Sequence, residues 1–191
     1  MSNARILADL MGTSTTVPSS KLSLAAGDLP SGTVLQVVTA EKTDAETISA
    51  TLNTYTDVPD LSLSITPRST TSRIFLLGQI SYSGAGYISY FSFRFLRDST
   101  AVGVGDASGS RTPGNSGFLQ SQSGDNGAIL TLPLQAIDSP ASTSALTYKL
   151  QLRQQFGSGS QTVNINRSTS DSDGASTHRN ISMLTAMEIA G

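Results

Sequence analysis

From Thr33 onward the chain alternates between apolar and polar residues with a period of two, and no long stretch shows the 3.6-residue period of a helix. The alternation is clear at Leu61, Leu63 and Ile65, and again along residues 146–152. Successive side chains of a strand point to opposite faces, so this period gives a strand one apolar and one polar face. We therefore expect an all-β protein.

The expected strands are short, rich in β-branched or aromatic residues, and bounded by Gly, Pro, Asp, Asn or Ser. They span residues 33–40, 47–56, 61–66, 72–82, 88–97, 100–104, 128–136, 145–155, 161–166 and 180–189. Many short strands separated by turns favour an antiparallel β-sandwich or a jelly-roll-like head. Pro133 has no N–H to donate to a neighbour, which predicts a sheet edge or a bulge for its strand.

Two of these strands carry apolar residues on both faces. In the strand at 88–97, three phenylalanines point one way, and Ile88, Tyr90 and Leu96 point the other way. In the strand at 72–82, Phe75 and Leu77 likewise lie opposite an apolar face. An antiparallel sheet normally turns one face to water, so the second face predicts either an oligomer interface or a local cover by the N-terminal segment or a long loop.

Residues 1–32 differ from the rest and are expected to form a short extended N-terminal arm, followed by a head domain at 33–191. A short helix at 4–11 would place four apolar residues near one face, and Gly12 would end it. We expect these residues to attach the arm to a partner: Ile6, Leu7, Leu10 and Met11.

Composition excludes several kinds of chemistry. The chain has no Cys, which excludes disulfides, thiol catalysis and thiolate metal centres, and one histidine, His178, which excludes His-rich metal sites. The net charge is −2 and the basic residues are scattered, so no nucleic-acid partner is expected. The apolar run 6–11 is too short and too polar for a signal peptide or membrane insertion. We expect no cofactor, no metal and no enzymatic activity; calcium binding by the acidic turn 171–174 stays open.

Two long loops, 105–127 and 167–179, are candidates for binding. In a strictly antiparallel arrangement the first loop shares its end of the sandwich with 83–87 and 157–160, and the second lies at the opposite end. Tyrosine suits the flat face of a sugar ring, and Tyr87 lies at a glycine-rich turn. In the alternative interpretation of that turn, Tyr82 and Tyr90 are cross-strand core partners. The receptor-binding candidates are Tyr87, Arg111, Asn115, Asp125 and Asn126.

Several phrases follow one another along nearly the whole chain. They are SNARILADLMGTSTTVPSSKLSL, LPSGTVLQVV, ITPRSTTSRIFLLGQISY, FRFLRDSTAVGVGDASGSR, LQAIDSPASTSALTYKLQLRQ and ISMLTAMEIA. Together they resemble the fibre proteins of tailed phages, in particular those of marine cyanobacterial phages. The resemblance implies a trimeric all-β head that is attached to the virion by its N-terminal arm and presents distal loops to a cell-surface receptor.

This resemblance predicts a non-enzymatic short tail fibre, assembled in the host cytoplasm and located in the virion. Its arm, residues 1–21, would dock to other tail or capsid proteins, and its homotrimeric head would bind a host glycan. Fibres generally have a long shaft, whereas here the head follows the arm almost at once. Two alternatives therefore stay open: a capsid decoration or cement protein, and a polysaccharide depolymerase.

Overall fold

The computed structural model describes residues 28–84, 88–121, 128–156 and 159–191, with backbone alone at 88–89 and 118–121. The predicted arm residues Ile6, Leu7, Leu10 and Met11 lie outside these ranges, as do Tyr87, Asp125 and Asn126. Among the described residues, no helix is long and apolar enough to cross a membrane.

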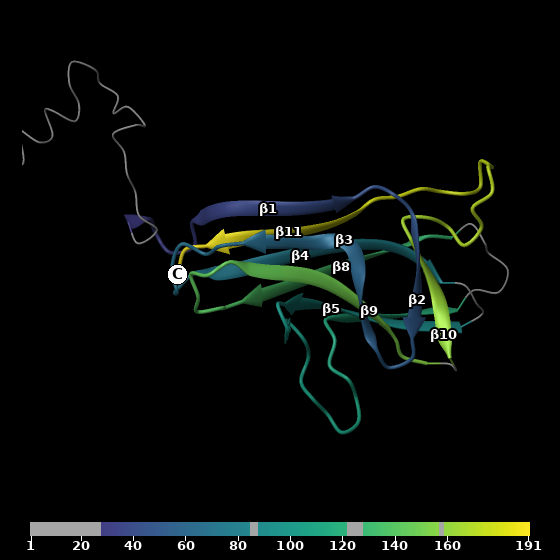
Figure 1. Cartoon of the computed structure of the whole chain (residues 1–191), viewed down its shortest axis with the longest axis horizontal. Helices are drawn as coiled ribbons and strands as arrows, with labels where there is room; N and C mark the ends of the chain where they lie inside the picture. Colours follow the sequence, from purple (N-terminus) through teal and green to yellow (C-terminus); the bar gives the residue numbers. More distant parts are fainter. Residues whose placement is uncertain (1–27, 85–87, 122–127, 157–158) are drawn as a thin grey trace, which may run out of the picture.

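Eleven strands make up the described fold, which confirms the all-β prediction. They are β1 (Val34–Lys42), β2 (Glu46–Thr51), β3 (Tyr55–Ile65), β4 (Arg73–Gly84), β5 (Ile88–Arg97), β6 (Thr100–Val102), β7 (Ser116–Ser121), β8 (Leu130–Asp138), β9 (Leu146–Gln154), β10 (Ser160–Ile165) and β11 (Ser182–Ile189). A six-stranded antiparallel sheet contains β1, β11, β4, β10, β2 and β8, and a five-stranded one contains β3, β9, β5, β6 and β7. The two sheets form a sandwich (Figure 1).

The core lies between the two sheets and follows the expected alternation. The inward side chains of β5, Phe91, Phe93 and Phe95, are fully buried. Gly78 of β4 leaves room for the Phe95 ring, because a Cβ at this position would lie 3.1 Å from a ring carbon. The Tyr82 ring packs 5.0 Å from that of Phe93. The phenylalanine face predicted from sequence is therefore the central layer of the core.

The interpretation in which Tyr82 and Tyr90 are cross-strand core partners was wrong. Tyr82 is fully buried on the inner face of β4 in the six-stranded sheet, whereas Tyr90 is half-buried in β5 of the five-stranded sheet. The turn is a crossover between sheets, so these two residues are not cross-strand partners. Tyr90 instead packs on Phe156, with ring centroids 5.3 Å apart.

Two strand boundaries differ from expectation for local backbone reasons. The predicted strand 47–56 is interrupted, because Asn53 has a φ of 62° and the chain turns after Thr51 into β3. Strand β3 then continues through the predicted strand 61–66, with a register shift between Asp57 and Ser62. Asp60, at a φ of 61°, lies in this bulge. A bulge re-aims a side chain out of the pleat, and the Asp60 carboxylate thereby reaches the other sheet.

Two further features concern the sheet edges. The predicted loop 105–127 contains a strand, β7, which pairs with β5. Strand β8 pairs with β4 alone among the described strands, and Pro133 lies opposite Gln79 in that pairing. The edge position predicted from Pro133 is confirmed.

Candidate functional site

The sandwich has two different ends (Figure 1). At one end, which we call the terminal end, the first described residues meet the C-terminal residues: Gly32 N–H donates to Ala190 O at 2.8 Å, and Ala190 N–H donates to Thr33 O at 2.8 Å. Several connections lie at the opposite end, which we call the loop end, whereas the connection between β6 and β7 projects from the side of the sandwich (Figure 1).

Pairing of the strands defines the loop end. Ile88 at the start of β5 lies opposite Ser121 at the end of β7, and Leu130 at the start of β8 lies opposite Tyr82. The connections 84–88, 121–130 and 154–160 begin or end here. The prediction for the first long loop is therefore correct only for the part that follows β7, because the part before β7 lies on the side of the sandwich (Figure 1).

The second long loop lies at this same end, which corrects the prediction that placed it at the opposite end. Strands β10 and β11 both pair antiparallel with the same side of β4, β10 at 82–84 and β11 at 73–79. Strands β10 and β11 therefore lie end to end along one side of β4. The connection 166–182 leaves the sheet between them, and we call it the excursion. Thr169 Oγ1 donates to Gly84 O at 3.1 Å, which ties the excursion to the end of β4.

Asn166 closes the base of this excursion. Its fully buried amide donates from Nδ2 to Lys42 O at 2.8 Å and to Asp44 O at 3.0 Å, and its Oδ1 accepts from Ser182 Oγ at 2.6 Å. A φ of 59° turns its backbone out of the strand, and its carbonyl accepts from Asn180 N–H at 3.1 Å. One side chain therefore joins the first and last residues of the excursion to the β1–β2 turn.

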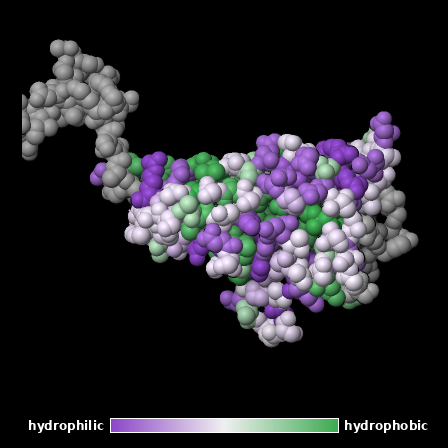
Figure 2. All heavy atoms as spheres, in the orientation of Figure 1, coloured by the Kyte–Doolittle hydropathy of each residue, from purple (hydrophilic) through white to green (hydrophobic). Residues whose placement is uncertain are grey.

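Polar contacts also organise the tip of the excursion. Arg179 pairs with Asp171, and Thr177 Oγ1 donates to the carbonyls of Ser172 and Gly174. A polar hollow of about 330 Å³ lies beside them, lined by these residues with Asp173 and His178. It offers hydroxyl, carboxylate and guanidinium groups, the hydrogen-bonding groups that suit a polyhydroxyl ligand. In the view of Figure 2, hydrophilic residues gather on this side of the molecule.

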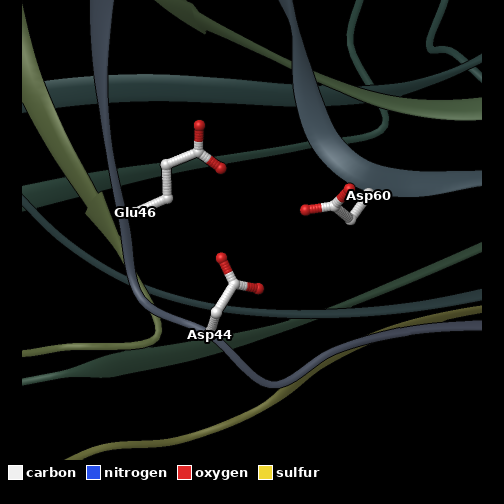
Figure 3. Close-up of side chains that lie close together, drawn as sticks. All are labelled: Asp44, Glu46 and Asp60. Atoms are coloured by element: carbon white, nitrogen blue, oxygen red, sulfur yellow. The ribbon is translucent and has the colours of Figure 1, made fainter.

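Three carboxylates beside the loop end, those of Asp44, Glu46 and Asp60, lie within 4.8 Å of one another (Figure 3). Such a cluster has the oxygen donors that a divalent cation uses. Here the Lys42 ammonium already contacts all three, at 3.0, 2.9 and 2.8 Å, and the Lys42 side chain has no exposed area. The cluster is therefore an ionic clasp, the Lys42 clasp, which joins β1 of one sheet to the β3 bulge of the other.

The Lys42 clasp perturbs the titration of its members. Burial disfavours the charged ammonium, but hydrogen bonds to Asp60, Glu46 and Asp44 outweigh it and raise the pKa of Lys42. The hydrogen bond from Lys42 lowers the pKa of Asp44. Both groups are therefore held in their charged forms at neutral pH.

A second clasp joins the sheets near the terminal end. Arg97 NH1 donates to both carboxylate oxygens of Asp138, at 2.8 and 2.7 Å, and the buried Tyr148 hydroxyl donates to the same carboxylate at 2.6 Å. Arg97 and Tyr148 belong to the five-stranded sheet and Asp138 to β8. Burial, together with the hydrogen bond to Asp138, raises the pKa of Tyr148. We call these three residues the Asp138 clasp.

The described receptor-binding candidates lie away from the loop end. Arg111 and Asn115 belong to the connection between β6 and β7, which projects from the side of the sandwich (Figure 1). The Asn115 side-chain amide already makes two hydrogen bonds within the protein, since Nδ2 donates to Gly103 O and to Gln135 O, both at 2.8 Å. Arg111 is exposed, with one bond to Ser108 Oγ at 3.3 Å. Arg111 thus remains accessible, whereas Asn115 holds its loop against β8.

The interface candidates Ile88, Tyr90 and Leu96 all belong to β5. Tyr90 and Leu96 are half-buried, and the structure describes backbone alone at Ile88. Their interface role stays a prediction.

The outer face of the five-stranded sheet around these residues is mostly polar. Arg94 lies over the Tyr55 ring at 3.7 Å from its centroid and donates to Gln151 at 2.9 Å. Gln151 and Lys149 in turn donate to Asp57 at 2.7 and 2.9 Å. These contacts pair most polar groups of this face with one another, whereas the buried Nε of Arg153 has no hydrogen-bond partner.

The outer face of the six-stranded sheet carries an apolar row by contrast, which includes Phe75, one of the two residues predicted to lie on this face. Across four strands the register places Val37, Met187, Phe75 and Ile137 in one row. Val37 is 53% exposed and Ile137 61% exposed. We call this surface the apolar face.

No protein-family model and no curated protein matches the chain. Among solved structures it is similar to the infectious bursal disease virus Gt strain, with a TM-score of 0.42 and 13% identity over 83% of this chain and 40% of that chain. The Gx strain gives 0.39 and 13% over 84% and 39%, and the VP2 subviral particle of that virus 0.36 and 12% over 81% and 38%. The chain thus spans about 40% of the length of the first of these. The strand pairing of this chain by itself establishes the two-sheet sandwich.

Sequence reasoning missed the two clasps and the Asn166 base. Each involves a charged or amide residue near the end of a strand: Lys42, Asp138 and Asn166. In a chain with only 14% charged residues, an isolated charge beside a strand end was the available signal. Its partners come from distant strands and had no local pattern.

Proposed function

We propose that the chain is a non-enzymatic structural protein of a virion, a short fibre or appendage whose head presents the loop end to a host surface. One observation carries the proposal: the N-terminal side of the head is pinned at the terminal end, and the excursion 166–182 lies at the opposite end. Attachment through residues 1–21 would then point the loop end away from the particle. The resemblance of the sequence to phage fibre proteins supports the same arrangement.

A host glycan is the proposed receptor. The excursion 166–182 has a closed base and a polar hollow at its tip, so its hydrogen-bonding groups are positioned before binding. Preorganised groups lower the entropy cost of binding. Several weak sites on one particle then raise the overall affinity through avidity.

Removal of residues 1–21 tests the attachment role. We expect the truncated head to fold with an unchanged circular dichroism spectrum, and virions made with it to lack the protein. Incorporation at the normal level would contradict attachment through the arm. Purified head should also compete with virions for adsorption to host cells. Arg179→Ala, which breaks the pair with Asp171 at the hollow, should weaken that competition, whereas the matched change Arg68→Ala at the terminal end should not.

A capsid decoration protein is the second candidate, and the apolar face favours it. A protein that clamps neighbouring shell subunits would use a flat sheet face, whereas a receptor-binding head uses loop tips. Electron microscopy of virions with a labelled protein separates the two candidates. Label at the tail supports the fibre, and label distributed over the shell supports the decoration protein.

A further inference from the structure

We propose that the apolar face is where copies of this chain pack against one another. The inference rests on the proposed function for the direction of assembly. It deepens that function because it names the partner of the apolar face, which is a second copy of the chain. Of the two strands whose second apolar face suggested an interface from sequence, the inference selects β4, with Phe75 and Leu77, over the β5 candidates.

The apolar face is continuous across the sheet. The row Val37, Met187, Phe75 and Ile137 crosses β1, β11, β4 and β8. Val34 and Ile189 extend it toward the terminal end, and Leu77 extends it toward the loop end. Polar side chains occupy the other positions of these two flanking rows: Arg73 in the first, and Thr39, Thr185 and Gln135 in the second. The exposure of Val34, Val37 and Ile137, at 50, 53 and 61%, shows that no described segment covers this surface.

The area fits a modest protein interface. Strands lie about 4.8 Å apart and same-face residues about 6.7 Å apart along a strand, so four strands and three rows span roughly 400 Å². This area is about half of the roughly 800 Å² that each partner contributes to a standard interface. The faces therefore associate weakly, and the assembly is expected to dissociate on dilution in the micromolar range.

The shape of the face favours a second copy over an unrelated loop. Flat sheets pack face to face with interdigitated side chains, and a second copy brings the same flat apolar surface. A hollow of about 150 Å³, lined by Arg73, Phe75, Ile137 and Ile189, lies within the face. The protruding valines of β1 on a neighbouring copy are of a size to enter it. A ridge on one part of the face and a hollow on another permit the head-to-tail contacts of a closed ring, in which each copy offers its ridge to one neighbour and its hollow to the other.

The proposed function sets the direction of assembly. Copies that share one attachment point must place their terminal ends together and their loop ends together. A rotation axis parallel to the strands does this, with the apolar faces turned toward the axis. Three copies around such an axis agree with the homotrimer predicted from sequence.

Sedimentation of the full chain at 1 to 100 µM tests the proposal, and we expect a species of about three chain masses that dissociates on dilution. The double variant Phe75→Asp/Ile137→Asp should sediment as a monomer over this range. The milder Ile137→Asp alone, at a 61% exposed position, should shift the dissociation at least tenfold toward monomer without a change in melting temperature. Ser64→Asp, at an exposed position of the five-stranded sheet, is the matched control and should associate normally.

The absence of cysteine allows a second, independent measurement. Val37→Cys should form an intermolecular disulfide under mild oxidation, and Ser64→Cys should not. A wild-type chain that stays monomeric at 100 µM would overturn the proposal. So would association that survives Phe75→Asp/Ile137→Asp, or association that appears only after residues 1–21 are removed, which would show that the arm of the same chain covers the face. None of these results alters virion incorporation or adsorption, so the proposed function is tested separately.

Discussion

The two clasps join the same pair of sheets with opposite charge arrangements. The Lys42 clasp has one cation among three carboxylates, and two of these, Asp44 and Asp60, are about two-thirds exposed, at 65% and 64%. The Asp138 clasp has one carboxylate held by a guanidinium and a phenol, and it is mostly buried. Loss of Lys42 leaves carboxylates that water can reach, whereas loss of Asp138 leaves the fully buried Tyr148 hydroxyl without an acceptor. The terminal end is therefore the more firmly closed end of the head, and the loop end is the more adjustable one.

The largest expected effect comes from the Asp138 clasp. Asp138→Ala leaves the Arg97 guanidinium and the buried Tyr148 hydroxyl without their acceptor. Removal of one partner of a buried ion pair costs about 3–5 kcal/mol, and urea unfolding should show a loss of this size. Glu41→Ala, at an exposed position, is the control with little change. A loss below about 1 kcal/mol would show that the two clasps are equally open to water.

Lys42→Met should cost less, about 2 kcal/mol, because the carboxylates it leaves can be hydrated. The three carboxylates would then repel one another and provide oxygen ligands for a cation. We expect millimolar calcium to raise the melting temperature of this variant and to leave that of the wild type unchanged, as measured by differential scanning calorimetry. An equal response of both proteins would show that the ammonium does not fill the cluster.

Asn166→Ala removes three hydrogen bonds at the base of the excursion, one from Ser182 and two to the β1–β2 turn. We expect a loss of about 1–2 kcal/mol, with faster hydrogen exchange confined to the loop end. Exchange that speeds equally at both ends would contradict the separation of the two ends.

The smallest effect is a difference in acid sensitivity. The lowered pKa of Asp44 means that its contribution to stability is present above the unfolded-state pKa of about 3.9 and is lost as pH falls through the folded-state value. Melting temperature should therefore fall below about pH 4, and Asp44→Asn should flatten part of this fall. In the Lys42→Met variant, protonation relieves repulsion, so its deficit relative to wild type should shrink between pH 7 and pH 4. A constant deficit over this range would contradict the clasp.

The period-two alternation was sufficient to predict the fold class and most strands, because burial on one face is a local property of each strand. It also revealed the second apolar side of β4 at Phe75 and Leu77. The break at Asn53 and the bulge at Asp60 were not predicted, because Asn and Asp can adopt a positive φ but most of them in a sequence do not. The prediction placed the segment 166–182 at the wrong end of the sandwich. The alternation of residues does not reveal that β10 and β11 lie end to end along the same side of β4. Clasp partners such as Lys42 and Asp60 meet across sheets, which no local pattern encodes.

The collinear arrangement of β10 and β11 has a consequence for how such a head changes over generations. Segment 166–182 is spliced into what is geometrically one strand, and its base is closed by Asn166 and Ser182. Codons gained, lost or exchanged inside it would leave every register of the sheet intact. Under the proposed function, a lineage could thus change the surface it presents to a host by recombination at this single site while inheriting the scaffold unchanged.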